Sequence, residues 1–312
     1  MKIVFMGTPD FAKTILEGLC EAGHEITAVY TQPDRPKGRS GKPVPSPVKE
    51  YAESRGLKVY QPERIKHPEE VGALQAIPAD IFVVAAYGQI LSREILDIPK
   101  YGCINAHGSL LPKLRGAAPI QRAIANGDDK TGITVMRMDE GMDSGDMILQ
   151  EEVEITDSDD EASMYEKLAK VGSRLTLEAL RLIEAGTAVY KKQDQSEVTF
   201  APMLKKEEGL LDFSLSARLL DCKVRGFKEW PTAYTFVSGK SLKVFGAREY
   251  KETPNFEVPS EAGLFVVTKK QLFVTTGAGL LELLEVQPEG KKRMGAMDFA
   301  RGQRIETGMK LG

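Results

Sequence analysis

The chain has 312 residues, a formal net charge of −3 and three cysteines. No apolar stretch is long enough to cross a membrane, for which about 18 uncharged residues are needed. The cysteines are scattered without metal-site spacing, which argues against a disulfide framework or a zinc site and fits a reducing cytoplasm. A chain of this length can form one large domain or two smaller ones.

Apolar runs alternate with helical segments in the first part of the chain. We expect strands at 2–6, 25–31, 80–86 and 102–106, and helices at 11–22, 47–55 and 68–76. The run 80–86 is continuously apolar, as in a strand buried on both faces. This alternation predicts a Rossmann-like, open, mostly parallel α/β sheet, in which ligands bind beyond the carboxyl ends of the strands.

The composition changes after a long predicted helix, which spans 160–185 and ends at Gly186. A polar segment follows, and then come short β-rich runs separated by turn residues, which predict a small OB-like antiparallel barrel. We therefore predict three parts: a catalytic domain at 1–189, a linker at 190–206 and a barrel domain at 207–312.

The turn after the first strand, Gly7-Thr8-Pro9-Asp10, does not have the G-x-G-x-x-G pattern of a dinucleotide site. Pro9 also removes a backbone N–H that could face a pyrophosphate. These departures argue against a nicotinamide or flavin cofactor.

Two polar side chains stand two residues apart at the end of a predicted strand. Asn105 and His107 should point to the same side, because side chains alternate along a strand. An amide and an imidazole aimed at one point can stabilise an oxygen that becomes negative during acyl transfer. The alternative is a hydrogen-bonded pair that only holds the following loop.

The stretch DEGMDSGD, at 139–146, contains four acids and two glycines. It lacks the spacing of an EF-hand calcium loop. It can be a plain acidic hairpin, or a turn in which Gly141 and Gly145 bring Asp143 against His107. A carboxylate in that position fixes the imidazole tautomer.

Positive charge collects in two places. The segment 34–49, DRPKGRSGKPVPSPVK, has five basic residues, one acid and four prolines, and it is long for an αβ connection. Residues 205–312 hold 18 Lys and Arg against 14 Asp and Glu, whereas residues 1–204 are net acidic. Both features suit a polyanionic partner such as a nucleic acid, although a solvated surface would look similar.

These pieces occur together, in order, in one family. The stretches that carry the resemblance are MGTPDFA at 6–12, TQPDRPKGR at 31–39, PSPVK at 45–49, AAYGQIL at 85–91, GCINAHGSLLPKLRGAAPIQRAI at 102–124, TGITVMRMDEGMDSGDM at 131–147 and KKEEGLLDF at 205–213. On these residues the chain resembles the methionyl-tRNA formyltransferases nearly from end to end.

The resemblance implies an enzyme that moves a formyl group from 10-formyltetrahydrofolate to the α-amine of initiator methionyl-tRNA. It implies a monomer that uses no metal, does not bind a membrane and binds the acceptor arm of the tRNA. It assigns catalysis to Asn105, His107 and Asp143; folate binding to Ser109, Leu110, Leu111, Pro112, Gln89, Ile90, Leu91, Asp139 and Gly141; and tRNA binding to Arg35, Lys37, Arg39 and Lys42.

One motif departs from the family. FKEWP at 227–231 stands where relatives often have Asn-Pro before Trp-Pro. We expect Trp230, the only tryptophan, to be a core residue at the entry to the barrel, with a stacking platform for RNA as the alternative. Other readings of the chain stay open: a formyltransferase for sugar-nucleotide or purine-pathway amines, a non-catalytic RNA-binding protein and a nucleotide-dependent oxidoreductase.

Overall fold

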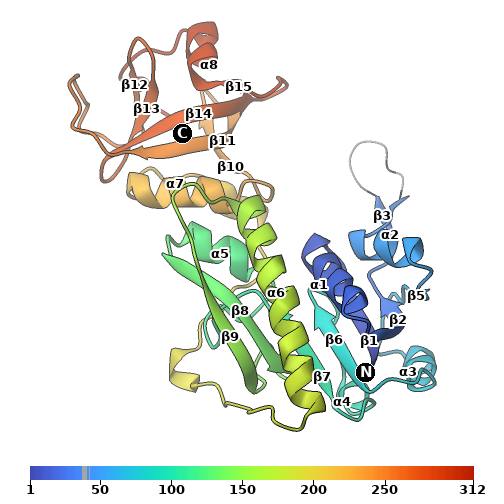
Figure 1. Ribbon diagram of the computed structural model, residues 1–312. Helices are drawn as coiled ribbons and strands as arrows, with labels where there is room; N and C mark the ends of the chain where they lie inside the picture. The colour runs from blue at the N-terminus through green and yellow to red at the C-terminus, as the bar shows by residue number, and fades with distance from the viewer. Residues whose placement is uncertain (37–40, 42) are drawn as a thin grey trace. The chain divides into compact units, whose positions relative to one another are not determined.

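The computed structural model describes residues 1–36, 41 and 43–312 (Figure 1). Lys37, Arg39 and Lys42, which the sequence assigns to tRNA binding, lie outside the described residues. The chain divides into two compact units. The first comprises 1–119, 130–154 and 164–202, and the second comprises 120–129, 155–163 and 203–312.

A seven-stranded sheet forms the core of the first unit. Its strand order is β5 (Val59–Tyr60), β2 (Glu25–Tyr30), β1 (Lys2–Gly7), β6 (Ile81–Ala85), β7 (Cys103–His107), β8 (Lys130–Arg137) and β9 (Met147–Glu154). The pairs from β5 to β7 are parallel, and β8 and β9 run antiparallel. This confirms the predicted mostly parallel α/β sheet.

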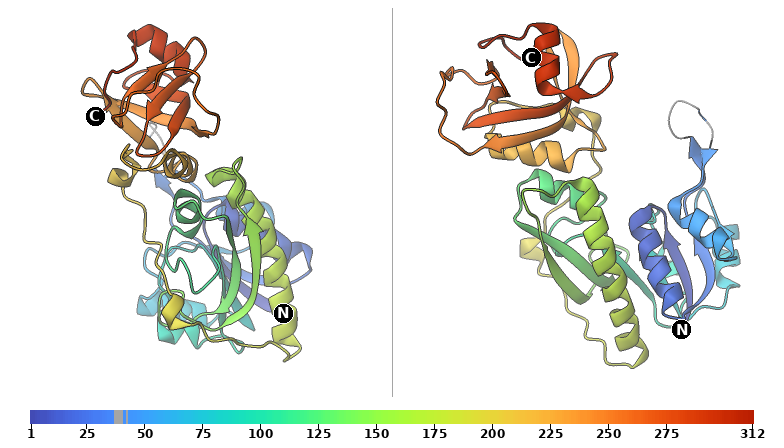
Figure 2. Two further views of the ribbon diagram at one scale, coloured as in Figure 1. Left: turned by 90° about the vertical axis from the view of Figure 1, so that its left-hand side faces the viewer. Right: turned by 45° about the horizontal axis from the view of Figure 1, so that its top comes forward.

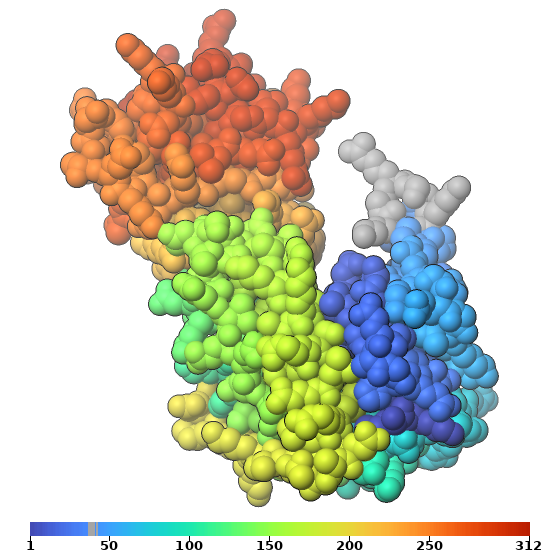
Figure 3. Space-filling model, in the orientation of Figure 1, coloured from blue at the N-terminus to red at the C-terminus, as the bar shows by residue number. Residues whose placement is uncertain are grey.

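Helices cover the sheet, and its central strands β1, β6 and β7 are buried along almost their whole length. Helices α1 (Asp10–Glu21) and α6 (Glu161–Glu184) lie side by side, and their atoms form a continuous surface (Figures 1 and 3). Gly18 of α1 permits this approach, because a Cβ there would lie 2.0 Å from the Ser173 hydroxyl oxygen of α6. A separate buried cluster joins β1, β2 and β6 to α3 (Pro68–Gln75) and α4 (Arg93–Leu96).

The register of the strands brings several strand ends to one edge of the sheet. Gly7 at the end of β1 pairs with Ala85 at the end of β6, and Val84 pairs with Asn105 of β7. Strand β7 is also where the sheet changes from parallel to antiparallel pairing. The carboxyl end of β7 is thus the place where an open α/β sheet binds ligands.

The second unit is built on a six-stranded antiparallel sheet. Strands β10 (Ala233–Val237), β11 (Lys240–Tyr250), β14 (Leu280–Pro288), β13 (Leu272–Thr275) and β12 (Phe265–Val267) follow in that order, and β15 (Met294–Gly295) pairs with β14. Helices α7 (Ala217–Gly226) and α8 (Ala296–Gln303) pack onto the same buried cluster (Figure 2).

The last residues of the chain connect the two edges of this sheet. Lys310 forms an antiparallel bridge with Leu264, next to β12, and the Gly312 amide donates to the Phe236 carbonyl of β10 at 3.0 Å. The hydrogen bonds therefore run around a closed circuit, which confirms the predicted antiparallel barrel. Closure also leaves fewer strand-edge groups exposed to another chain.

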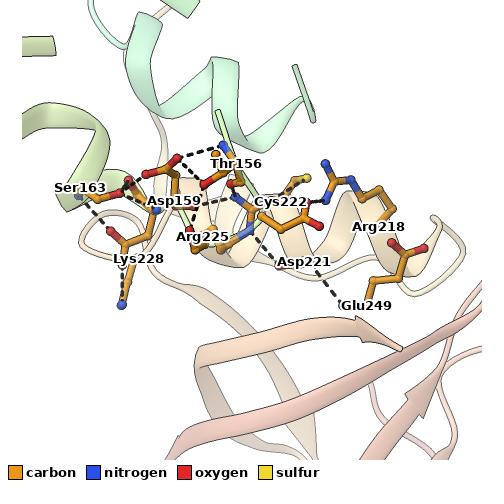
Figure 4. A network of polar contacts seen from close by, with 12 residues as sticks. Thr156, Asp159, Ser163, Arg218, Asp221, Cys222, Arg225, Lys228 and Glu249 are labelled. Atoms are coloured by element: carbon orange, nitrogen blue, oxygen red, sulfur yellow. Dashed lines mark hydrogen bonds and ion pairs between the residues drawn. The ribbon is translucent and has the colours of Figure 1, made fainter. Parts of the chain in front are cut away.

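A polar network explains why residues 155–163 group with the second unit (Figure 4). The Arg225 guanidinium, on α7, donates to the Asp159 carbonyl at 2.6 Å and to Asp221 Oδ1 at 3.0 Å. Lys228 Nζ reaches Asp160 Oδ2 at 2.6 Å. These residues come from two separate parts of the sequence, 159–160 and 221–228, so their grouping depends on tertiary contacts.

Trp230 corrects one expectation. Its side chain is 53% exposed rather than buried in the core, and its indole Nε1 donates to the Leu204 carbonyl at 3.4 Å. Among the described residues, no helix has the length and apolar character needed to cross a membrane.

Two leucines of β14 give a matched test of the barrel core. Leu281 is fully buried and Leu284 is 42% exposed. We expect Leu281→Ala to lower the free energy of unfolding by about 2–5 kcal/mol through lost burial and a cavity, and Leu284→Ala by less than about 1 kcal/mol. Urea unfolding followed by the fluorescence of Trp230 reports on this unit. Equal losses in the two variants would contradict the described core.

Candidate active site

Strand β7 places an amide and an imidazole on one face. Asn105 and His107 are 9% and 6% exposed, so both are shielded from solvent. Asn105 Nδ2 lies 3.4 Å from Asp143 Oδ1, and His107 Nδ1 lies 3.6 Å from Asp143 Oδ2. The structure thus brings together the three side chains to which the sequence assigns catalysis.

The Asp143 carboxylate reaches β7 because the turn after β8 folds back on itself. The Met138 amide still donates to the Cys103 carbonyl, at the start of β7, and Arg137 N donates to Asp146 O at 2.8 Å. Asp143 itself has a φ of +49°, in the left-handed region that disfavours most side chains. A Cβ at Gly145 would lie 1.7 Å from the Arg137 carbonyl oxygen, so only glycine fits there.

The acid at the start of the turn stabilises the turn rather than pointing to solvent. Asp139 Oδ1 accepts hydrogen bonds from Gly141 N at 3.0 Å and Ser144 Oγ at 2.7 Å. The sequence assigns Asp139 and Gly141 to folate binding, and in the structure they define the shape of the turn that carries Asp143.

The loop after β7 contacts both His107 and Asp143 through its backbone. His107 Nε2 lies 3.1 Å from the Leu114 carbonyl, which can only accept, so Nε2 carries the proton. The Gly116 amide donates to Asp143 Oδ2 at 2.9 Å. With Nε2 engaged, Nδ1 is the ring nitrogen that faces Asp143.

The predicted folate turn, residues 109–112, is fixed by one buried hydroxyl. Thr134 Oγ1 donates to the Ser109 carbonyl at 2.7 Å and accepts from the Leu111 amide at 3.1 Å. Gln150 Nε2 joins the Leu111 carbonyl and the Thr134 hydroxyl, each at 2.9 Å. Leu111 and Pro112 are buried, and Leu110 packs over Gly132.

The other predicted folate residues follow β6. Gln89 uses its side chain within the chain, since Oε1 accepts from Ile65 N and Nε2 donates to Pro62 O, both at 2.8 Å. Ile90 is 83% exposed, whereas Leu91 is buried. Only the backbone of Gln89 and the side chain of Ile90 remain available to a ligand here.

A polar cavity of about 270 Å³ lies beside the turn that carries Asp143. It is lined by Arg93, Leu96, Asp97, Gly102, Cys103, Arg137, Met138, Asp139, Gly145 and Asp146. Burial raises the pKa of the Cys103 thiol to about 12, which keeps it protonated and unreactive as a nucleophile. Among the described residues, no group of three or more His, Cys, Asp or Glu side chains is placed to hold a metal.

The basic segment 34–49 is anchored at its base. Strands β3 (Arg35–Pro36) and β4 (Pro43–Val44) pair antiparallel, and Ser46 caps α2 (Pro47–Ser54). A hydrogen bond from Lys49 Nζ to Asp34 Oδ2 at 2.7 Å lowers the pKa of Asp34. Arg35 is exposed at this base and lies 3.4 Å from Gln32 Oε1.

Sequence reasoning missed the residues that hold the site together. The Gly116 amide donates to the Asp143 carboxylate, and the Thr134 hydroxyl donates to the Ser109 carbonyl. Gln193, which donates to the Asp143 carbonyl, lies in the segment predicted to be a linker. None of them forms a motif. The only available signal was the absence of charge at Gln193 among charged neighbours.

Two family models match the chain. Residues 1–180 match the formyl transferase model, and residues 203–304 match the formyl transferase C-terminal domain. A methionyl-tRNA formyltransferase of Agathobacter rectalis is 46% identical over 308 residues, which cover 99% of this chain and 98% of that protein. The chain belongs to the methionyl-tRNA formyltransferase family.

Further comparisons agree with this family. The methionyl-tRNA formyltransferase of Bacillus subtilis is 45% identical over 313 residues, covering 100% of this chain and 98% of that protein. The fold is shared with an N-formyltransferase from Helicobacter canadensis, solved with folinic acid and dTDP-3-aminofucose (TM-score 0.68, 19% identity, 92% of this chain and 99% of that one). At that identity the likeness extends to the fold alone.

Thr134 offers a test of the loop that follows β7. Thr134→Val removes the hydroxyl but keeps the volume, and it leaves the Leu111 amide without its buried acceptor. We expect a loss of about 1–3 kcal/mol in stability and faster amide hydrogen exchange in residues 109–113. Thermal unfolding and exchange mass spectrometry measure these effects. Thr134→Ser keeps the hydroxyl and should retain slow exchange; equally fast exchange in both variants would rule out the hydroxyl as the cause.

Proposed function

We propose that this enzyme transfers the formyl group of 10-formyltetrahydrofolate to the α-amine of initiator methionyl-tRNA, and that Asn105, His107 and Asp143 carry the chemistry. The observation that supports this most directly is the convergence of these three side chains at the end of β7, in a chain of this family. Translation chemistry of this kind fits a cytoplasmic enzyme that acts as a monomer.

The reaction needs a neutral amine and a stabilised oxyanion. The amine nitrogen attacks the formyl carbon, and the carbonyl oxygen becomes negative in a tetrahedral intermediate. The second amide hydrogen of Asn105 can donate to that oxygen, and a protonated His107, whose Nδ1–H faces Asp143, places positive charge beside it. Collapse of the intermediate breaks the bond between the formyl carbon and N10.

Proton transfer completes the balance. The attacking amine loses one proton, and N10 of tetrahydrofolate must gain one as it leaves. Asp143 lies beside His107, so we assign it the proton that the amine loses and the transfer of that proton to N10, directly or through water. The Gly116 amide keeps its Oδ2 in place during this step.

The folate would be held by three segments of the first unit. These are the turn 109–112, the backbone at 89–91 and the turn at 139–141, the last of which borders the polar cavity at Asp139. Folinic acid in the Helicobacter canadensis relative supports a folate ligand for this fold.

The tRNA would meet the basic parts of the chain. We assign phosphate contacts to Arg35, Lys37, Arg39 and Lys42, and contacts with the acceptor arm to the barrel. Residues 205–312 carry more basic than acidic groups, which suits a polyanion. The relatives that share this chain's length are named for methionyl-tRNA.

Substitution of the three catalytic residues tests the mechanism. We expect Asn105→Ala, His107→Ala and Asp143→Asn each to lower kcat by about 10²–10³, because each removes one donor or the proton acceptor. The affinity for tRNA should not change. Formylation of radiolabelled methionyl-tRNA gives kcat, and filter binding gives the affinity. Glu69→Gln on α3, which also neutralises a carboxylate, is the control, and full activity in Asp143→Asn would refute its role.

The basic segment is tested through salt dependence. We expect the double variant Arg39→Ala/Lys42→Ala to raise the KM for methionyl-tRNA and to reduce the slope of log affinity against log salt by about 2, one for each lost phosphate contact. Lys170→Ala, which removes a lysine paired with Glu166, serves as the control. An unchanged KM and slope would show that the segment does not contact the tRNA.

A further inference from the structure

The segment that reads as a linker is part of the first unit. Lys191 bridges to Met147 at the start of β9, and Phe200 bridges to Arg115 in the loop after β7. The Arg115 amide donates to the Thr199 carbonyl at 2.9 Å, and the Ala201 amide donates to the Arg115 carbonyl at 2.7 Å. Residues 191–201 therefore run along the two segments that surround the catalytic groups.

One side chain of this segment joins those two segments directly. Gln193 is 6% exposed, and its Nε2 donates to the carbonyls of Asp143 and Gly145, each at 2.8 Å. Its Oε1 accepts from Arg115 Nε at 3.0 Å and Nη2 at 2.7 Å. The amide thus has two hydrogen bonds at the nitrogen and two at the oxygen.

The two segments that Gln193 joins are those that orient the catalytic groups. On one side, Asp143 and Gly145 belong to the turn whose backbone is left-handed at Asp143. On the other side, Arg115 stands between Leu114, which accepts from His107, and Gly116, which donates to Asp143. A shift of either segment would change the distance between the carboxylate and the imidazole.

The chemistry at this position calls for an amide. A donor is needed toward two carbonyl oxygens, and an acceptor is needed toward a guanidinium that is itself 6% exposed. A carboxylate would serve the guanidinium but would place an oxygen against the two carbonyls. A methionine would fill the volume and leave all these polar groups without partners.

We propose that Gln193 is a positioning residue for the formyl transfer: its amide holds the Asp143 turn against the loop at 114–116 and so sets the carboxylate on His107. This inference rests on the proposed function. Among the described residues, no hydrogen bond joins Gln193 to the turn at 109–112 or to the segment 34–49, so we expect it to act on turnover rather than on tRNA affinity.

The decisive variant is Gln193→Glu. It keeps an acceptor for Arg115, and a purely structural role in burying that guanidinium would survive. It loses the donors to Asp143 and Gly145, so we expect kcat to fall by about 10–100-fold, as for a displacement of about 1 Å in a catalytic group. The KM for methionyl-tRNA should not change, whereas the KM for 10-formyltetrahydrofolate should rise as kcat falls, because the loosened turn includes residues assigned to folate.

Gln75→Glu on α3 is the matched control, because it adds the same charge on an exposed side chain of the same unit. We expect it to keep the kcat of the unmodified enzyme. If Gln193→Glu kept that kcat as well, or changed only a KM, the positioning role would be wrong. Should Gln193→Glu fail to fold, as judged by thermal unfolding, Gln193→Met carries the same expectation for kcat.

A second measurement does not depend on activity. Amide hydrogen exchange in residues 139–146 should be faster in Gln193→Glu and Gln193→Met than in the unmodified enzyme or Gln75→Glu, because the turn loses its buried donors. Unchanged exchange would overturn the inference. An unmodified enzyme without formyl transfer would instead overturn the proposed function, while the exchange result would still decide whether Gln193 holds the turn.

Discussion

The site depends on one constraint: a carboxylate must be held against β7 by a residue whose backbone is left-handed. Asp143 lies in the sequence far from Asn105 and His107, and a non-glycine residue with positive φ persists only where its surroundings fix it. Here the Gly116 amide fixes the carboxylate, and the Gln193 amide fixes the backbone carbonyl. Strand β7 points Asn105 and His107 to one side, and the loops bring the Asp143 carboxylate to them.

This arrangement explains the glycines and the hydroxyl around the site. A Cβ at Gly145 would collide with the Arg137 carbonyl, and a Cβ at Gly116 would lie 2.6 Å from the Ala201 carbonyl. Thr134 fixes the turn at 109–112 in the same way, through one hydroxyl with three partners. At Gly145 and Gly116 a backbone carbonyl lies where a side chain would otherwise be. A hydrogen-bonded backbone group has less conformational freedom than a side chain.

The sequence predicted those parts of the site that follow from local rules. Alternation along a strand places Asn105 and His107 on one face, and two flanking glycines single out Asp143. The contacts of Gln193 and Thr134 could not be predicted, because they depend on which distant carbonyls come within reach. Trp230 was wrongly expected in the core, since an apolar residue type does not by itself decide burial. The grouping of residues 155–163 with α7 and the residues after it likewise depends on a hydrogen bond to the Asp159 carbonyl and on the ion pair of Lys228 with Asp160, which form only after folding.

Charge pairing in the second unit shows where a polyanion could gain contacts. Arg218 and Lys251 both meet Asp157, and the hydrogen bond from Lys251 is the main reason that the pKa of Asp157 falls to about 2. Such cations are already neutralised. At the end of the barrel where β11 begins and β14 meets β15, the exposed cations make no ion pair within the described residues; they are Lys240, Lys243, Lys291, Lys292 and Arg293. A nucleic-acid phosphate can bind these cations directly and release its own condensed counterions. A paired cation such as Lys251 would first have to leave its carboxylate.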